Sequence, residues 1–256
     1  MTLENYTPES YLELIEGWED PNPAPVIQQH NGLFIVRDDL LGYGSKARFI
    51  DYLIKSNPDI DEWVYGCAPR WGYGSVSAAY VCTKYGKKFT VFIAKSNEWH
   101  SSQLKAQKFG ANFKEVDMGM MVVTQARAKE YVRKGGPRVA LAPFGLNHPT
   151  VLASIIKVAR DMPVKPKEFW TVGGSGTLNT GLQLAWPDAK ANIVQLGHKL
   201  TPQEYGRAKV WESSYKFNQK VKAKHFPPYP SILEYDAKLW EFRQHIPEGA
   251  LIWNVA

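Results

Sequence analysis

The chain has 256 residues, of which 44% are hydrophobic and 22% are charged, and its formal net charge is +6. This length allows one large domain or two smaller ones with a hydrophobic core, and the composition excludes a globally disordered chain. The absence of a membrane-length apolar run, of a secretory signal at the start and of more than two cysteines predicts a cytoplasmic protein without a membrane partner.

The positive charge permits anionic partners, but the lysines are scattered. Modest clusters occur only at Lys84, Lys87 and Lys88 and in the segment 220–224. This distribution favours a solvated surface, and nucleic acid stays as the less favoured alternative partner. Cys67 and Cys82 lack metal-ligand spacing, so we expect two buried small apolar side chains and no metal site.

An N-terminal arm, residues 1–24, precedes the first predicted strands. It contains a short amphipathic helix over residues 8–15 and ends in a proline-rich break. The turn Asn31-Gly32 predicts a hairpin, whose second arm, residues 33–36, is apolar.

Lys46 follows a glycine-rich turn and stands where a helix over residues 47–54 begins. The positive end of a helix dipole disfavours a cation and would lower the pKa of the amine. A lowered pKa suits a nucleophile or a Schiff-base lysine. The alternative is a surface lysine in a loop.

From residue 62 onwards, apolar strands alternate with helical segments, which predicts right-handed βαβ units and an α/β fold. The tail, residues 198–249, is less regular, and an apolar strand over residues 250–253 follows it. The predicted strands cover residues 63–67, 89–93, 112–116, 138–141, 169–172 and 191–196, and the predicted helices cover residues 75–85, 98–108, 125–134, 150–162 and 178–185.

A second glycine-rich stretch follows the strand that ends at Val172 and opens a helix. It consists of Gly173, Gly174, Ser175, Gly176 and Thr177. Converging backbone N–H groups, the helix N-terminus and two hydroxyls would form a phosphate cradle. The stretch lacks the lysine of a P-loop, and no acidic residue lies at the distance typical of a dinucleotide site.

A nucleophilic lysine and a phosphate cradle without a nucleotide motif indicate pyridoxal 5'-phosphate, with Lys46 bound to its aldehyde. Over roughly residues 25–197 the chain resembles the fold-type II pyridoxal-phosphate enzymes, the tryptophan synthase β-subunit-like family. It is most similar to the branch of 1-aminocyclopropane-1-carboxylate deaminase and D-cysteine desulfhydrase. The resemblance rests on residues 37–40 with 44–48, on the glycine-rich stretch 173–177 and on residues 108–111.

This resemblance implies an α/β fold with two three-layer αβα lobes and the cofactor between them. The larger lobe would contain residues 1–59 and 143–256, and the smaller inserted lobe residues 60–142. It also implies a homodimer and a lyase, deaminase or β-replacement reaction on a small amino acid or its adduct. Lys46 would hold the cofactor and move the α-proton.

Several positions depart from the family pattern. The family's Ser-x-Asn loop is replaced here by residues 70–75, so Ser75 or Ser77 would supply a hydroxyl and Arg70 would bind the substrate carboxylate in a bidentate manner. Tyr73 would stack on the ring or transfer a proton, with a packing role as the equal alternative. Asn254 would occupy the place of the Ser or Thr beside the pyridine nitrogen, and its neutral amide would leave that nitrogen unprotonated.

These departures keep two further hypotheses open. One is a repurposed or non-catalytic member of the fold that binds a phosphate-bearing ligand, including a nucleotide- or nucleic-acid-linked one. The other is a nucleotide-binding α/β protein in which Lys46 contacts a phosphate. His100 and His148 are candidate acid/base groups near loop ends, although lone histidines are more often structural. The run 147–149 looks like a helix cap.

Overall fold

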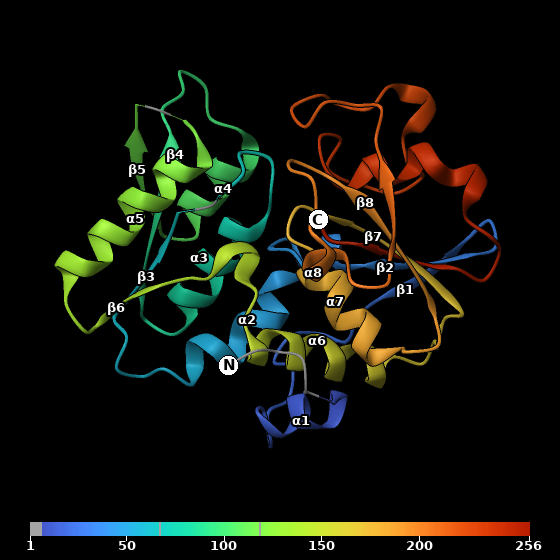
Figure 1. Ribbon diagram of the computed structural model, residues 1–256, viewed down its shortest axis with the longest axis horizontal. Coiled ribbons are helices and arrows are strands. Elements are labelled where there is room, and N and C mark those ends of the chain that lie inside the picture. Colours follow the sequence, from blue (N-terminus) through green and yellow to red (C-terminus); the bar gives the residue numbers. More distant parts are fainter. Residues whose placement is uncertain (1–6, 67, 118) are drawn as a thin grey trace.

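Two β-sheets form the centres of two α/β lobes in the computed structural model, which describes residues 7–66, 68–117 and 119–256 (Figure 1). The strand order of each sheet shows how the chain is divided between the lobes. The six strands of the larger sheet lie in the order β1 (Ile27–His30), β2 (Leu33–Arg37), β10 (Leu251–Asn254), β7 (Glu168–Gly173), β8 (Lys190–Gln195) and β9 (Lys209–Glu212). The four strands of the smaller sheet lie in the order β5 (Ala111–Val116), β4 (Lys88–Ala94), β3 (Glu62–Tyr65) and β6 (Val139–Leu141).

The larger sheet therefore combines strands from both ends of the chain, and the smaller one uses a single internal stretch. Its strands all lie within the segment 60–142 that the sequence assigns to the inserted lobe. The pair β1–β2 is an antiparallel hairpin, as predicted from its turn, where Asn31 and Gly32 have φ of 47° and 76°. All other paired strands are parallel, so their carboxyl ends point the same way within each sheet.

Each sheet is covered on both faces. In the larger lobe, helices α2 (Lys46–Lys55), α6 (Pro149–Asp161) and α7 (Thr177–Ala185) cover one face, and the 3₁₀ segment η5 (Asp236–His245) covers the other. Side chains alternate along a strand, so on β10 Trp253 packs with the helices and Ile252 packs with η5. The outer layer of this lobe is thus a 3₁₀ segment with irregular chain, and it belongs to the tail for which the sequence predicted less regular structure.

In the smaller lobe, α3 (Gly74–Lys84) and α4 (Ser101–Lys108) pack on one face and α5 (Met121–Gly135) on the other. Val64 and Phe92 face Ala128 of α5, whereas Trp63 and Val91 point to the opposite face. Both lobes therefore have three layers.

The least regular parts of the sequence differ most from the prediction. The tail contains β9, which pairs with β8 and was not predicted, because Lys209–Glu212 has only two apolar residues. The remaining short elements are α1 (Pro8–Glu13), η2 (Asp38–Leu41), η3 (Phe144–Leu146), α8 (Pro202–Tyr205) and η4 (Ala223–His225). Among the described residues, no helix has both the length and the apolar character that crossing a bilayer requires.

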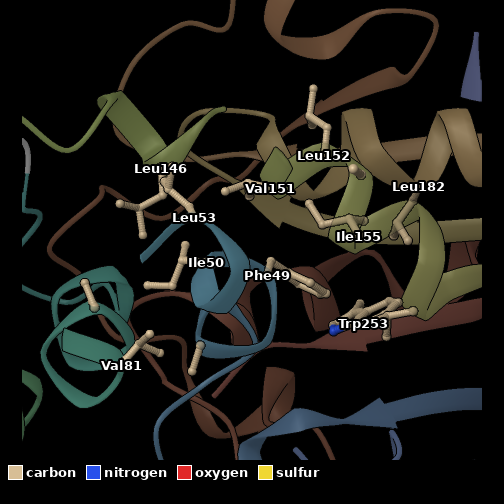
Figure 2. Close-up of a cluster of buried hydrophobic side chains, with 14 of the residues drawn as sticks. Phe49, Ile50, Leu53, Val81, Leu146, Val151, Leu152, Ile155, Leu182 and Trp253 are labelled. Carbon is tan, nitrogen blue, oxygen red and sulfur yellow. The ribbon is translucent and has the colours of Figure 1, made fainter. Parts of the chain in front are cut away.

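The helix α2, which begins at Lys46, is fixed by apolar packing. Figure 2 shows Phe49, Ile50 and Leu53 of α2 among side chains of α3, α6 and β10. The rings of Phe49 and Trp253 lie 6.0 Å apart. The first turn of α2 is thereby held against the centre of the larger sheet.

A buried ion pair fixes the turn that precedes this helix. Arg48, which is 1% exposed, donates from Nε to Oδ1 of the fully buried Asp38 at 2.9 Å. Its Nη1 donates to Asp20 Oδ2 at 2.7 Å. The indole N–H of Trp253 bonds to Asp38 Oδ2 and to Ser45 Oγ, each at 3.0 Å. The residues around Lys46 in the sequence motif therefore have a structural role of their own.

Candidate functional site

A cavity of about 540 Å³ lies at the carboxyl ends of the parallel strands. Segments that follow β2, β3, β4, β7 and β8 all contribute to its lining, so both lobes form its walls. Ligands of open parallel sheets bind at this edge, and the volume is typical of a small-molecule site.

Lys46 lines this cavity as the first residue of α2. Its Nζ donates to the carbonyl oxygen of Gly145 at 2.8 Å, and no carboxylate of the described residues forms an ion pair with it. Burial lowers the pKa of the Lys46 amine from its ordinary value of 10.5 to about 8. The sequence also predicted a lowered pKa, but from the helix dipole, whereas the cause in the structure is burial. An appreciable fraction of the amine is thus neutral at near-neutral pH.

The glycine-rich segment lies on the same cavity wall, between β7 and α7. Gly176 is the N-cap of α7 with φ of 68°, and a Cβ there would lie 1.8 Å from the carbonyl oxygen of Glu204. No side chain caps the helix, so its first N–H groups have neither an intrahelical bond nor a cap. An uncapped helix N-terminus at a cavity is a binding site for an anionic group such as a phosphate.

Gly145 connects Lys46 to the glycine-rich segment through hydrogen bonds. Its carbonyl oxygen accepts from Lys46 Nζ and, at 3.3 Å, from Thr177 Oγ1. Ser175 Oγ lies 3.1 Å from Thr177 Oγ1. The structure therefore brings together the two motifs that the sequence singled out, although more than a hundred residues separate them.

The loop after β3 forms the wall contributed by the smaller lobe. Arg70, Trp71 and Tyr73 line the cavity. Arg70 donates from Nη2 to the carbonyl oxygen of Glu98, while its buried Nε has no hydrogen-bond partner. Lys105 Nζ lies 3.4 Å from the Tyr73 hydroxyl. One donor of Arg70 is thus unused by the described residues of the protein.

Three predicted site residues do not line this cavity. Ser77 is fully buried and donates from Oγ to the carbonyl oxygen of Tyr43 at 2.6 Å. Ser75 borders only a small separate hollow beside it. The Asn254 amide nitrogen donates to Asp39 Oδ1 and to the Pro230 carbonyl, and its oxygen accepts from Ser231. The polar groups of Ser77 and Asn254 are therefore used within the protein.

Tyr235 and Asp236 line the cavity instead, although no sequence signal predicted a site there. Asp236 is 7% exposed, and its Oδ1 has no hydrogen-bond partner. Burial raises the pKa of the Asp236 carboxyl to about 8, and bonds from the backbone of Ala256 and Val255 oppose the shift. Such an unsatisfied buried carboxyl is a frequent mark of a functional site. It lies in the irregular tail, where no motif or periodicity pointed to it.

The raised pKa predicts a pH-dependent stability. The folded carboxyl binds a proton at a pH where the unfolded one, with an ordinary pKa of 3.8, has lost it, so stability falls as pH rises from about 4 to about 8. Asp236→Asn removes this dependence, and each pH unit in that window corresponds to at most ~1.4 kcal/mol. We expect the variant to have the higher unfolding midpoint at pH 8 and the gap to narrow towards pH 4. Thermal melts of both proteins across this pH range check the prediction. Unfolding midpoints that change with pH to the same extent in both proteins would contradict it.

The remaining candidates have structural roles. His100 and His148 do not line the cavity, and their ring nitrogens cap α4 and α6 by accepting from the backbone N–H of Ser102 and Thr150. Cys82 is buried, and Cys67 lies outside the described residues.

No family model and no curated protein matches the sequence. Solved structures do match the fold. The structure of an ACC deaminase homologue superposes with a TM-score of 0.81 at 15% identity, over 98% of this chain and 94% of that chain. A hydrogen sulfide-producing enzyme from Fusobacterium nucleatum has a TM-score of 0.63 at 14% identity, over 100% of this chain and 97% of that one. Serine racemase from Dictyostelium discoideum gives 0.64 at 12% identity, over 97% and 96%. The predicted fold is thereby confirmed.

Proposed function

We propose that this protein is a pyridoxal-phosphate-dependent enzyme that acts on an amino acid or an amino-acid adduct, of the lyase, deaminase or β-replacement type. The observation that carries the proposal is the buried amine of Lys46, with its pKa lowered to about 8, linked through Gly145 to an uncapped helix N-terminus in one cavity. Enzymes with this fold and such names as serine racemase and ACC deaminase homologue support it.

The residues present fit this cofactor. The glycine-rich segment would bind the phosphate, because the helix that it opens is uncapped and the first N–H groups of α7 are left for an anion. Asp236 has a free carboxyl oxygen on the same cavity and is available for the pyridine nitrogen, in place of Asn254. When bound, pyridoxal phosphate supplies an electron sink for a negative charge at the substrate α-carbon.

Three residues of the protein would have separate roles in the reaction. Lys46 would hold the cofactor aldehyde and, once displaced by the substrate amine, take the proton from the α-carbon on its Nζ. Arg70 would orient the substrate through its carboxylate, using the Nε that has no partner within the protein. Tyr73, at the cavity beside them, would be a second proton-transfer group.

Reaction of the purified protein with pyridoxal phosphate tests the proposal. We expect a visible absorbance band that borohydride removes, and mass spectrometry should then find the reduced cofactor on the peptide containing Lys46. A screen of amino acids for release of ammonia or sulfide would identify the reaction. Absence of the band would contradict the proposal and would favour a member of the fold that binds another phosphate-bearing ligand, to be tested by titration with nucleotides.

A further inference from the structure

Three aromatic side chains, from both lobes, line one side of the cavity and contact one another. Trp71, from the smaller lobe, and Phe217, from the tail of the larger lobe, meet edge to face with ring centroids 5.2 Å apart. Phe217 also packs against Tyr235, at 6.4 Å. All three rings are half-buried and line the cavity, so each keeps some surface for a ligand.

A buried lysine holds Phe217 in this position. Lys238 is 0% exposed, and its Nζ donates to the carbonyl oxygens of Lys216 at 2.8 Å and Phe217 at 3.0 Å. No carboxylate of the described residues lies within ion-pair distance of it. A buried amine is costly unless hydrogen bonds satisfy it, so these two bonds fix the backbone of the segment that presents Phe217.

The charges of the cavity disfavour a cationic substrate side chain. Among the described residues that line it, Asp236 is the one acid, whereas Lys46, Arg70 and Lys95 are basic. An ammonium side chain would therefore find no free carboxylate other than the one available to the cofactor. An aromatic side chain would find ring edges and faces.

We propose that Trp71 and Phe217 form the specificity wall of the enzyme and receive an aromatic side chain of the amino-acid substrate. This inference rests on the proposed function. Lys238 is a positioning residue that acts through Phe217. Water leaves the ring surfaces when a phenyl group packs on them, and the gain is smaller for a methyl group because it buries less apolar area.

Stopped-flow absorbance titrations of the protein loaded with pyridoxal phosphate would test it, because they give a dissociation constant for each amino acid before turnover. The panel contains phenylalanine, alanine and lysine, each as both enantiomers. For one enantiomer, we expect phenylalanine to bind about 10-fold more tightly than alanine, and lysine to bind no better than alanine.

Four substitutions distinguish recognition of the substrate side chain by Trp71 and Phe217 from a general effect on amino-acid binding. Trp71→Ala and Phe217→Ala should remove most of the phenylalanine preference and change alanine binding less than about 2-fold, whereas Phe217→Tyr should keep the preference. Phe226→Ala is the matched control, since Phe226 is 45% exposed in the same tail and does not line the cavity. It should change neither constant.

Lys238→Met tests the positioning role. It should lower the ratio of phenylalanine to alanine affinity and leave alanine binding intact, which a loss of stability alone would not do. A protein that binds the cofactor but shows no phenylalanine preference, or keeps it in both alanine variants, would overturn this inference and leave the proposed function standing. A protein that binds no cofactor would overturn both.

Discussion

Replacing Lys46 with alanine is expected to lower the turnover of the cofactor-loaded protein at least ~10³-fold, because a residue that both holds the cofactor and transfers a proton has no substitute. The amine lies in the cavity and is bonded only to the Gly145 carbonyl, so no described neighbour occupies an equivalent position. Steady-state assays on the substrate found by the screen measure this loss.

Lys55→Ala is the matched control, since Lys55 is the last residue of the same helix and is exposed. It should leave turnover unchanged. A small primary amine such as methylamine should restore part of the activity of the Lys46→Ala protein by replacing the missing proton acceptor. If Lys46→Ala keeps a tenth of the wild-type rate, the role assigned to this lysine is wrong.

The same lysine sets a pH dependence for cofactor uptake. Only the neutral amine reacts with an aldehyde, and burial lowers the pKa of Lys46 to about 8. The initial rate of uptake should rise with pH up to about 8 and level off above it. An exposed lysine would instead give a rate that still rises towards pH 10. Stopped-flow absorbance between pH 6 and 10 distinguishes these curves.

The largest loss of stability is expected from breaking the buried pair of Asp38 and Arg48. Arg48→Met leaves the carboxylate of Asp38 without its cationic partner in a site that has no solvent access, and removing one partner of a buried pair costs ~3–5 kcal/mol. Urea unfolding, followed by tryptophan fluorescence, gives the change in unfolding free energy.

The exposed pair of Asp61 and Arg138 provides the comparison, because water can solvate either charge after its partner is removed. Arg138→Met should leave the unfolding curve unchanged. Equal effects from the two methionine substitutions would show that burial does not determine the contribution of the Asp38–Arg48 pair.

The sequence sufficed for the fold because the signals that define it are local. Apolar strands, glycine stops and the two glycine-rich turns each depend on a few neighbouring residues. Strand β9, which is the edge strand of the larger sheet, and the 3₁₀ segment η5, which packs on that sheet, lacked such signals. Their contact with each other depends on scattered aromatic residues such as Trp211 and Phe242. Their positions follow from the tertiary fold.

The same limit applied to the site. Lys46 and Gly176 lie in turns that the sequence could identify. Asp236 is a single acid in an irregular segment, and only the fold shows that it is buried at the cavity. Ser77 illustrates the reverse case, because a hydroxyl near the expected loop bonds to the Tyr43 backbone of a neighbouring segment. Spacing along the chain cannot show which partner a hydroxyl finds.

The position of β10 has a consequence for the order in which the protein folds during synthesis. Strand β10 lies between β2 and β7, so the hairpin β1–β2 has no parallel partner until residues 251–254 have left the ribosome. The four-stranded sheet needs only residues 62–141 and can form well before. Until β10 inserts, the edges of β2 and β7 are open to pairing with other nascent chains. A translational pause shortly before residue 251 would therefore prolong the aggregation-prone stage and leave the smaller lobe unaffected.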